Sequence, residues 1–191
     1  MQQQPMSLKP GCNLFLLLCI AHQRCLVVPM RNFFGMHALG MPSILGLLLM
    51  LIWSALSEDP VMFVWMAAWG ICFAHRCMQS LRMEREGAKV HSQYDGWPFE
   101  TIKMGKTENT SKLVVEPLMV VIIGAILVVI YKEFHLNMKG LPLFFLLGGF
   151  TLPVIEMIKQ SIWKKRTQEM MDAQIENEAA VREFREKFGA F

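Results

Sequence analysis

Four apolar blocks, each close to the length of a bilayer crossing, constrain the fold of this chain more than any other feature. They cover residues 38–56, 61–80, 113–131 and 141–158. A helix of about 20 apolar residues spans the roughly 30 Å of bilayer hydrocarbon. Only 18% of the 191 residues are charged, whereas a soluble domain carries roughly a quarter. The sequence therefore predicts an all-α integral membrane protein and excludes an ordinary soluble enzyme and a disordered chain.

The links between the blocks predict how the crossings pair. Residues 57–60 form a four-residue turn, so we expect 38–80 to be a tight antiparallel transmembrane hairpin. A short link at 132–140 predicts a second transmembrane hairpin over 113–158. The polar stretch 81–112 separates the two hairpins, and 159–191 is typical of a polar helix beyond the last crossing.

Two further features concern the ends of this arrangement. Gly148-Gly149 and Pro153 predict a kink or a close helix contact in the fourth block.

Residues 1–37 precede the first crossing and contain an apolar run, 13–21, that is too short to span the hydrocarbon. We expect an interfacial helix lying on the membrane there, with insertion of residues 1–29 as the alternative.

The distribution of Lys and Arg predicts the orientation. The segments before the first crossing, between the second and third, and after the fourth hold 17 of them, against 2 in the other two links. Because positive charge is retained on the cytoplasmic side, both termini and the 81–112 loop should be cytoplasmic. A bacterial inner membrane is the expected location.

Glu116 and Glu156 are the candidates for an ion path. Antiparallel third and fourth crossings would bring the two carboxylates to similar depths near the cytoplasmic face. Ionisable groups within hydrocarbon usually face a cavity, water or a partner charge. The pair therefore indicates a proton or cation relay, or alternatively snorkelling and structural pairing with Lys112 and Lys159.

Two similar stretches place a cysteine three residues before a histidine. Cys19 and His22 form one pair, and Cys72 and His75 form the other. Residues three apart share a helical face, so the two pairs could supply four ligands to zinc or another soft metal. Both pairs also occur at the cytoplasmic ends of apolar runs, where histidine and basic residues are expected anyway. We therefore assign no cofactor.

Two cytoplasmic segments are candidates for docking a partner protein. The loop carries aromatic residues around a turn, and the last helix carries a broken apolar stripe. The docking candidates are Tyr94, Asp95, Trp97, Phe99, Ile175, Phe184 and Phe188. The alternatives are a loop folded onto the membrane surface and a solvated or oligomer-forming helix. Residues 159–191 are nearly neutral, which disfavours direct nucleic-acid binding.

These observations support three hypotheses of function. The leading one is a non-enzymatic integral subunit of a larger membrane assembly, with secretion or DNA-transfer machinery as an example. The second is a small homo-oligomeric transporter or channel that uses Glu116 and Glu156. The third is a metal- or haem-binding membrane protein. The sequence lacks a Walker A loop, a dinucleotide fingerprint and the HExxH and GxSxG motifs, which favours a protein that is not an enzyme.

Overall fold

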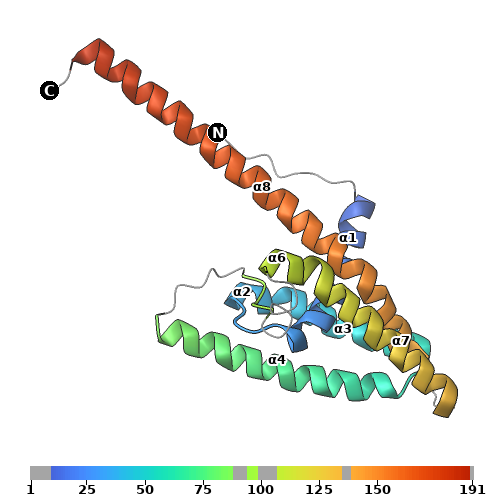
Figure 1. Cartoon of the computed structure of the whole chain (residues 1–191). Coiled ribbons are helices and arrows are strands. Elements are labelled where there is room, and N and C mark those ends of the chain that lie inside the picture. Colours follow the sequence, from blue (N-terminus) through green and yellow to red (C-terminus); the bar gives the residue numbers. More distant parts are fainter. Residues whose placement is uncertain (1–9, 88–93, 99–106, 135–138, 190–191) are drawn as a thin grey trace. The chain divides into compact units, whose positions relative to one another are not determined.

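A computed structural model describes residues 10–87, 94–98, 107–134 and 139–189, and almost all of these residues are helical. The elements in chain order are α1 (Pro10–Met30), α2 (Met36–Leu39), α3 (Met41–Ser57), α4 (Val61–Arg85), α6 (Glu108–Thr110), the π-helix η1 (Ser111–Val115), α7 (Glu116–Phe134) and α8 (Gly140–Phe188) (Figure 1). Pairing of the strand type occurs within these residues only as one bridge, between Asn32 and Trp97.

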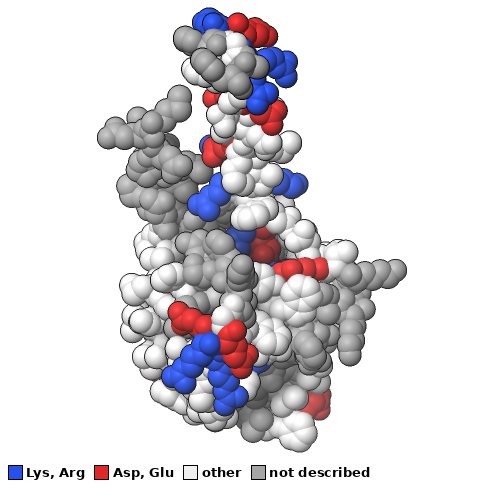
Figure 2. Space-filling model, turned by 90° about the vertical axis from the view of Figure 1, so that its left-hand side faces the viewer, with Lys and Arg blue, Asp and Glu red and all other residues white. Residues whose placement is uncertain are grey.

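Four helical segments in the described ranges are long and apolar enough to cross a membrane. They are His37–Ser57, Val61–Arg85, Glu108–Phe134 and Gly140–Lys187. These segments cover the four predicted blocks, so the prediction of an all-helical, polytopic membrane protein is confirmed. Large apolar side chains are exposed on all four, and residues other than Lys, Arg, Asp and Glu, drawn in white, make up much of the surface that Figure 2 shows. A lipid-facing surface requires this composition.

The chain divides into two units, a bundle unit of residues 1–155 and a C-terminal unit of residues 156–191. The helix α8 contributes its first part to the bundle unit and its remainder to the C-terminal unit. The core lies in the bundle unit and joins residues of α1 with residues of α3, α4, α7 and the first part of α8.

The first helix differs from the sequence expectation. It does not end with the apolar run 13–21 but continues through the polar residues His22-Gln23-Arg24 to Met30. Its second half is buried and packs against α3 and α4, whereas an interfacial position of the run 13–21 stays a prediction. Burial of His22 is tolerated because both of its ring nitrogens have partners. The Nδ1 atom of His22 lies 2.8 Å from Thr151 Oγ1, and its Nε2 atom lies 3.0 Å from the Phe144 carbonyl oxygen.

Glycines allow α7 and α8 to approach closely. A β-carbon built on Gly148 would collide with Leu26 and lie 2.8 Å from Val120 Cγ1, and one on Gly149 would collide with Val121. On the facing helix, a β-carbon on Gly124 would lie 3.0 Å from the Leu146 side chain. The predicted close helix contact at Gly148-Gly149 is therefore confirmed, and α8 continues through Pro153.

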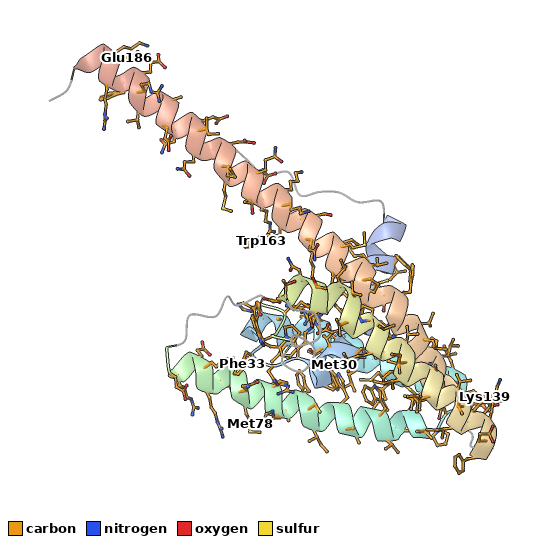
Figure 3. All side chains as sticks on the ribbon, viewed as in Figure 1. Met30, Phe33, Met78, Lys139, Trp163 and Glu186 are labelled. Atoms are coloured by element: carbon orange, nitrogen blue, oxygen red, sulfur yellow. The ribbon has the colours of Figure 1, made fainter. Side chains whose placement is uncertain are left out.

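Hydrogen bonds join the elements at two ends of the bundle unit. At one end, Asp59 accepts from the backbone N–H of Val61 at 2.9 Å and of Leu141 at 2.8 Å. The turn after α3 is thereby tied to the start of α8. At the other end, the Phe33 backbone N–H donates to Gln79 Oε1 of α4 at 3.2 Å. Figure 3 shows Phe33 near the end of α4 that carries Met78, with Lys139 at the opposite end of this unit.

Candidate functional site

A buried ion pair joins the end of α1 to the start of α7. Arg31 follows α1 directly, Glu116 is the first residue of α7, and both side chains are 0% exposed. The Arg31 Nε atom donates to the two carboxylate oxygens of Glu116 at 3.1 and 3.0 Å, and Nη2 donates to Oε2 at 2.5 Å. A planar guanidinium that engages both oxygens of a carboxylate is a strong and orientation-specific contact.

A second carboxylate extends this pair to a loop. Arg31 Nη1 donates to Asp95 Oδ2 at 2.8 Å and to the Asp95 carbonyl oxygen at 3.2 Å. Arg24, from the middle of α1, contacts Asp95 Oδ1 through Nη1. We refer to Arg24, Arg31, Asp95 and Glu116 as the arginine–carboxylate cluster. Its two positive and two negative charges balance, as burial of charged groups requires.

Backbone contacts hold the loop residues 94–98 against the segment that follows α1. The Asn32 N–H donates to the Trp97 carbonyl oxygen at 2.9 Å, and the Trp97 N–H donates to the Asn32 carbonyl oxygen at 2.5 Å. The Gly35 N–H donates to the Tyr94 carbonyl oxygen at 2.9 Å. Gly96 has a φ of +81°, which glycine adopts without strain. The loop is thus fixed, while Trp97 remains 37% exposed.

A second group of polar side chains lies beside the cluster. The Tyr94 hydroxyl donates to Glu108 Oε1 at 2.8 Å, and Lys112 Nζ donates to the same oxygen at 2.6 Å. Lys112 Nζ also lies 4.9 Å from the centre of the Tyr94 ring, a cation–π geometry. Burial and the hydrogen bond to the Glu108 carboxylate raise the pKa of Tyr94, so its hydroxyl keeps the proton that it donates.

A π-helical turn precedes Glu116 for a reason that can be read from the sequence. Pro117 has no N–H, and its ring would clash with the carbonyl four residues earlier. The π-helix over Ser111–Val115 lies where this clash interrupts the regular hydrogen bonds. The wider turn leads into α7, which begins at Glu116 with the carboxylate buried.

The two predicted ion-path residues have different partners. The expected pairing of Glu116 with Lys112 is wrong, because Arg31 engages Glu116 and Lys112 engages Glu108. Glu156, the first residue of the C-terminal unit, is buried, and its Oε1 lies 3.6 Å from Lys159 Nζ. The pairing of Glu156 with Lys159 is therefore confirmed. A relay through Glu116 and Glu156 stays a prediction.

The residues proposed as metal ligands are not brought together. His22 is buried between Phe144 and Thr151, whereas His75 is exposed beside Arg76. Among the residues that the structure describes, no group of three or more His, Cys, Asp or Glu side chains is placed to hold a metal ion. The predicted site built from Cys19, His22, Cys72 and His75 does not form in this structure.

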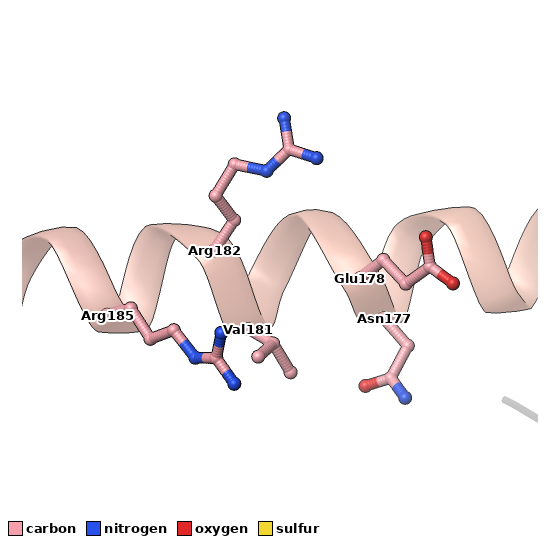
Figure 4. Close-up of a pocket in the computed structure, with 5 residues that line it drawn as sticks. All are labelled: Asn177, Glu178, Val181, Arg182 and Arg185. Carbon is pink, nitrogen blue, oxygen red and sulfur yellow. The ribbon is translucent and has the colours of Figure 1, made fainter. Parts of the chain in front are cut away.

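Three of the docking candidates, Trp97, Ile175 and Phe184, are exposed, whereas Tyr94 and Asp95 are half-buried. Ile175 and Phe184 are each 63% exposed, while Phe99 and the Phe188 side chain fall outside the described part of the chain. Charges of both signs are interspersed along α8 (Figure 2). A shallow depression in the same region is lined by Asn177, Glu178, Val181, Arg182 and Arg185 (Figure 4). One helix supplies all five residues, so the depression is a feature of the helix surface and not an enclosed cavity.

Sequence reasoning missed Arg24, Arg31 and their role. Both were counted only as positive charges near the cytoplasmic side. One signal was present, because Arg24 lies between two apolar stretches that form one helix if they are joined. A charge inside a helix of that kind needs a buried partner. The identity of the partners was not visible, because Asp95 and Glu116 follow Arg31 by 64 and 85 residues.

Comparisons of the chain with protein-family models, with curated proteins and with solved structures find no match.

Proposed function

We propose that the chain is a non-enzymatic integral membrane subunit of a larger multi-protein membrane assembly, for which secretion or DNA-transfer machinery is an example. The observation that carries this proposal is the apolar surface of the C-terminal unit. Among the described side chains after Trp163, five large apolar ones are between 46% and 63% exposed on a highly charged stretch of the helix. They are Met170, Met171, Ile175, Val181 and Phe184. A series of apolar side chains on an otherwise polar helix is typical of a protein-binding face.

The loop at 94–98 supports a second contact surface. The arginine–carboxylate cluster fixes Asp95, and the bridge to Asn32 fixes the backbone on either side of Gly96. A fixed loop with an exposed tryptophan binds a partner at a lower entropic cost than a mobile loop does. The polar side chains of this site hold the loop in place through their contacts with Asp95. This role fits docking of a partner better than it fits catalysis.

The proposal includes an orientation with both termini in the cytoplasm and the four crossings arranged as two antiparallel hairpins. The excess of Lys and Arg in three segments supports it. The contacts within the bundle unit are consistent with it as well. Asp59 bonds to Leu141 between the two links that are poor in basic residues, while Arg31 and Glu116 meet beside the segments that are rich in them.

Deletion of residues 164–191 tests the proposed docking role of the C-terminal helix. We expect the shortened chain to insert into membranes at the level of the full chain and to lose at least one protein that the full chain retains in mild detergent. The substitution Trp97→Ala tests the loop in the same way. Its matched control is Phe63→Ala, because Phe63 is an exposed aromatic residue of α4. Retention of every partner by both altered chains would remove the docking role from these two surfaces.

A further inference from the structure

One line of uncharged residues along α8 follows a seven-residue pattern. Starting at Trp163 and alternating steps of four and three residues, the pattern reaches eight positions up to Phe188. None of the eight is charged, although the positions between them hold twelve charged residues. The eight are Trp163, Thr167, Met170, Gln174, Asn177, Val181, Phe184 and Phe188. We refer to them as the α8 seam. Five of the eight are large apolar residues, and a line of mostly apolar residues that repeats every 3.5 residues is typical of a coiled coil.

The structure places the large apolar members of the seam at the surface. Trp163, Met170 and Phe184 are each 62–63% exposed, and Val181 is 46% exposed. In Figure 4, Asn177 and Val181 project from the same side of the helix, while Arg182 projects from the opposite side. The 26 residues from Trp163 to Phe188 extend about 39 Å as a helix. This length holds nearly four heptads, enough for a two-stranded coiled coil.

We infer that the occupant of the α8 seam is the same seam of a second copy of this chain, in a parallel and in-register dimer. Two copies anchored in one membrane leave it in the same direction and at the same depth. Their α8 helices are therefore parallel, and identical residues lie at the same height. This inference rests on the proposed function, which places the C-terminal part of α8 in water. It adds that one partner of this helix is a second copy of the chain.

The seam is compatible with itself in charge and in polarity. In a parallel pair, each position that flanks the seam on one side faces the position five residues later on the other helix. The three flanking pairs that fall within the seam are Arg166 with Met171, Ala173 with Glu178, and Ala180 with Arg185. Each contains an uncharged residue, so no like charges oppose each other. Asn177 would face the same residue of the second copy, so the two side-chain amides can hydrogen-bond to each other.

Disulfide cross-linking in native membranes tests this arrangement on the full chain. Val181→Cys and Phe184→Cys place a thiol on the seam, whereas the matched controls Arg182→Cys and Glu186→Cys place one on the outer face. The unsubstituted chain supplies the background from its own five cysteines. After mild oxidation, we expect a covalent dimer in the two seam variants at several times the level in the two controls. Adding Phe184→Asp to Val181→Cys should remove most of that dimer.

Two outcomes would overturn the inference. Equal cross-linking at all four positions would indicate random collision, and background-level cross-linking in the seam variants would mean that the two seams do not meet. These failures differ from a failure of the proposed function. If seam cross-links are absent while other proteins co-purify, the subunit proposal stands without the dimer. If seam cross-links form and no other protein co-purifies, the dimer stands and the subunit proposal does not.

Discussion

The carboxylate of Glu116 faces the guanidinium of Arg31 in an interior that excludes water from both. Removing the Glu116 charge leaves Asp95 as the one carboxylate shared by Arg24 and Arg31, so the buried cluster keeps an excess positive charge, at a cost of about 3–5 kcal/mol. We therefore expect Glu116→Gln to lower the midpoint of thermal unfolding in mild detergent by many degrees. The substitution Glu169→Gln is the control, because that carboxylate is exposed and its contact with Lys165 contributes little.

A double substitution separates this structural role from a role in ion transport. Replacing Arg31 and Glu116 together by methionine removes both charges, so the loss of stability should be smaller than for Glu116→Gln alone. If Glu116→Gln instead left the unfolding midpoint unchanged and abolished a measured ion flux in liposomes, Glu116 would belong to a conduction path.

Gly96 and Gly87 share a backbone conformation but differ in their surroundings. Both have a positive φ, of +81° and +71°. A β-carbon on Gly96 would lie 2.9 Å from Arg31 Cβ, whereas one on Gly87 would meet no atom within 4 Å. Both alanine variants carry backbone strain of about 1–2 kcal/mol, but only Gly96→Ala also displaces the loop. We expect faster trypsin cleavage between Gly87 and Thr107 in Gly96→Ala alone, and equal rates in both variants would contradict the observed packing of the loop.

At the scale of the elements, the contact of α7 with α8 depends on glycine. The side chain introduced by Gly148→Val would overlap Leu26 and Val120, and overpacking of this kind costs about 1–3 kcal/mol. Gly70 of α4 has no neighbour within 4 Å of its built β-carbon, so Gly70→Val is the control. We expect a lower unfolding midpoint for Gly148→Val only. A similar decrease for both variants would mean that the two helices do not approach at Gly148.

The elements also show how far the sequence could predict the fold. The four crossings were predictable because a run of apolar residues of bilayer length has few alternatives. The first helix was not, because its polar residues 22–24 indicate an end unless their partners are known. Those partners, such as Thr151 and Phe144 for His22, come from distant parts of the chain. The same reason hid the arginine–carboxylate cluster, whose members are separated by up to 92 residues.

At the scale of the whole molecule, the proposed orientation can be tested with single cysteines. Lys139 and Glu84 are both exposed. Lys139 lies in the link between α7 and α8, and Glu84 lies at the end of α4. The proposed orientation puts these two residues on opposite sides of the membrane. In spheroplasts, a membrane-impermeant maleimide should label Lys139→Cys at once and Glu84→Cys only after permeabilisation, relative to the unsubstituted chain. Labelling in the reverse order would invert the proposed orientation.

The native mass of the protein, purified in mild detergent from the membranes in which it naturally occurs, tests membership of a larger assembly most directly. The chain itself has a mass of 21.9 kDa. We expect a species much heavier than a dimer of this chain, with other proteins present in fixed ratios to it and identified by mass spectrometry. A species that contains only this chain, as a monomer or a homo-oligomer, would contradict the proposed function and would favour the transport hypothesis instead.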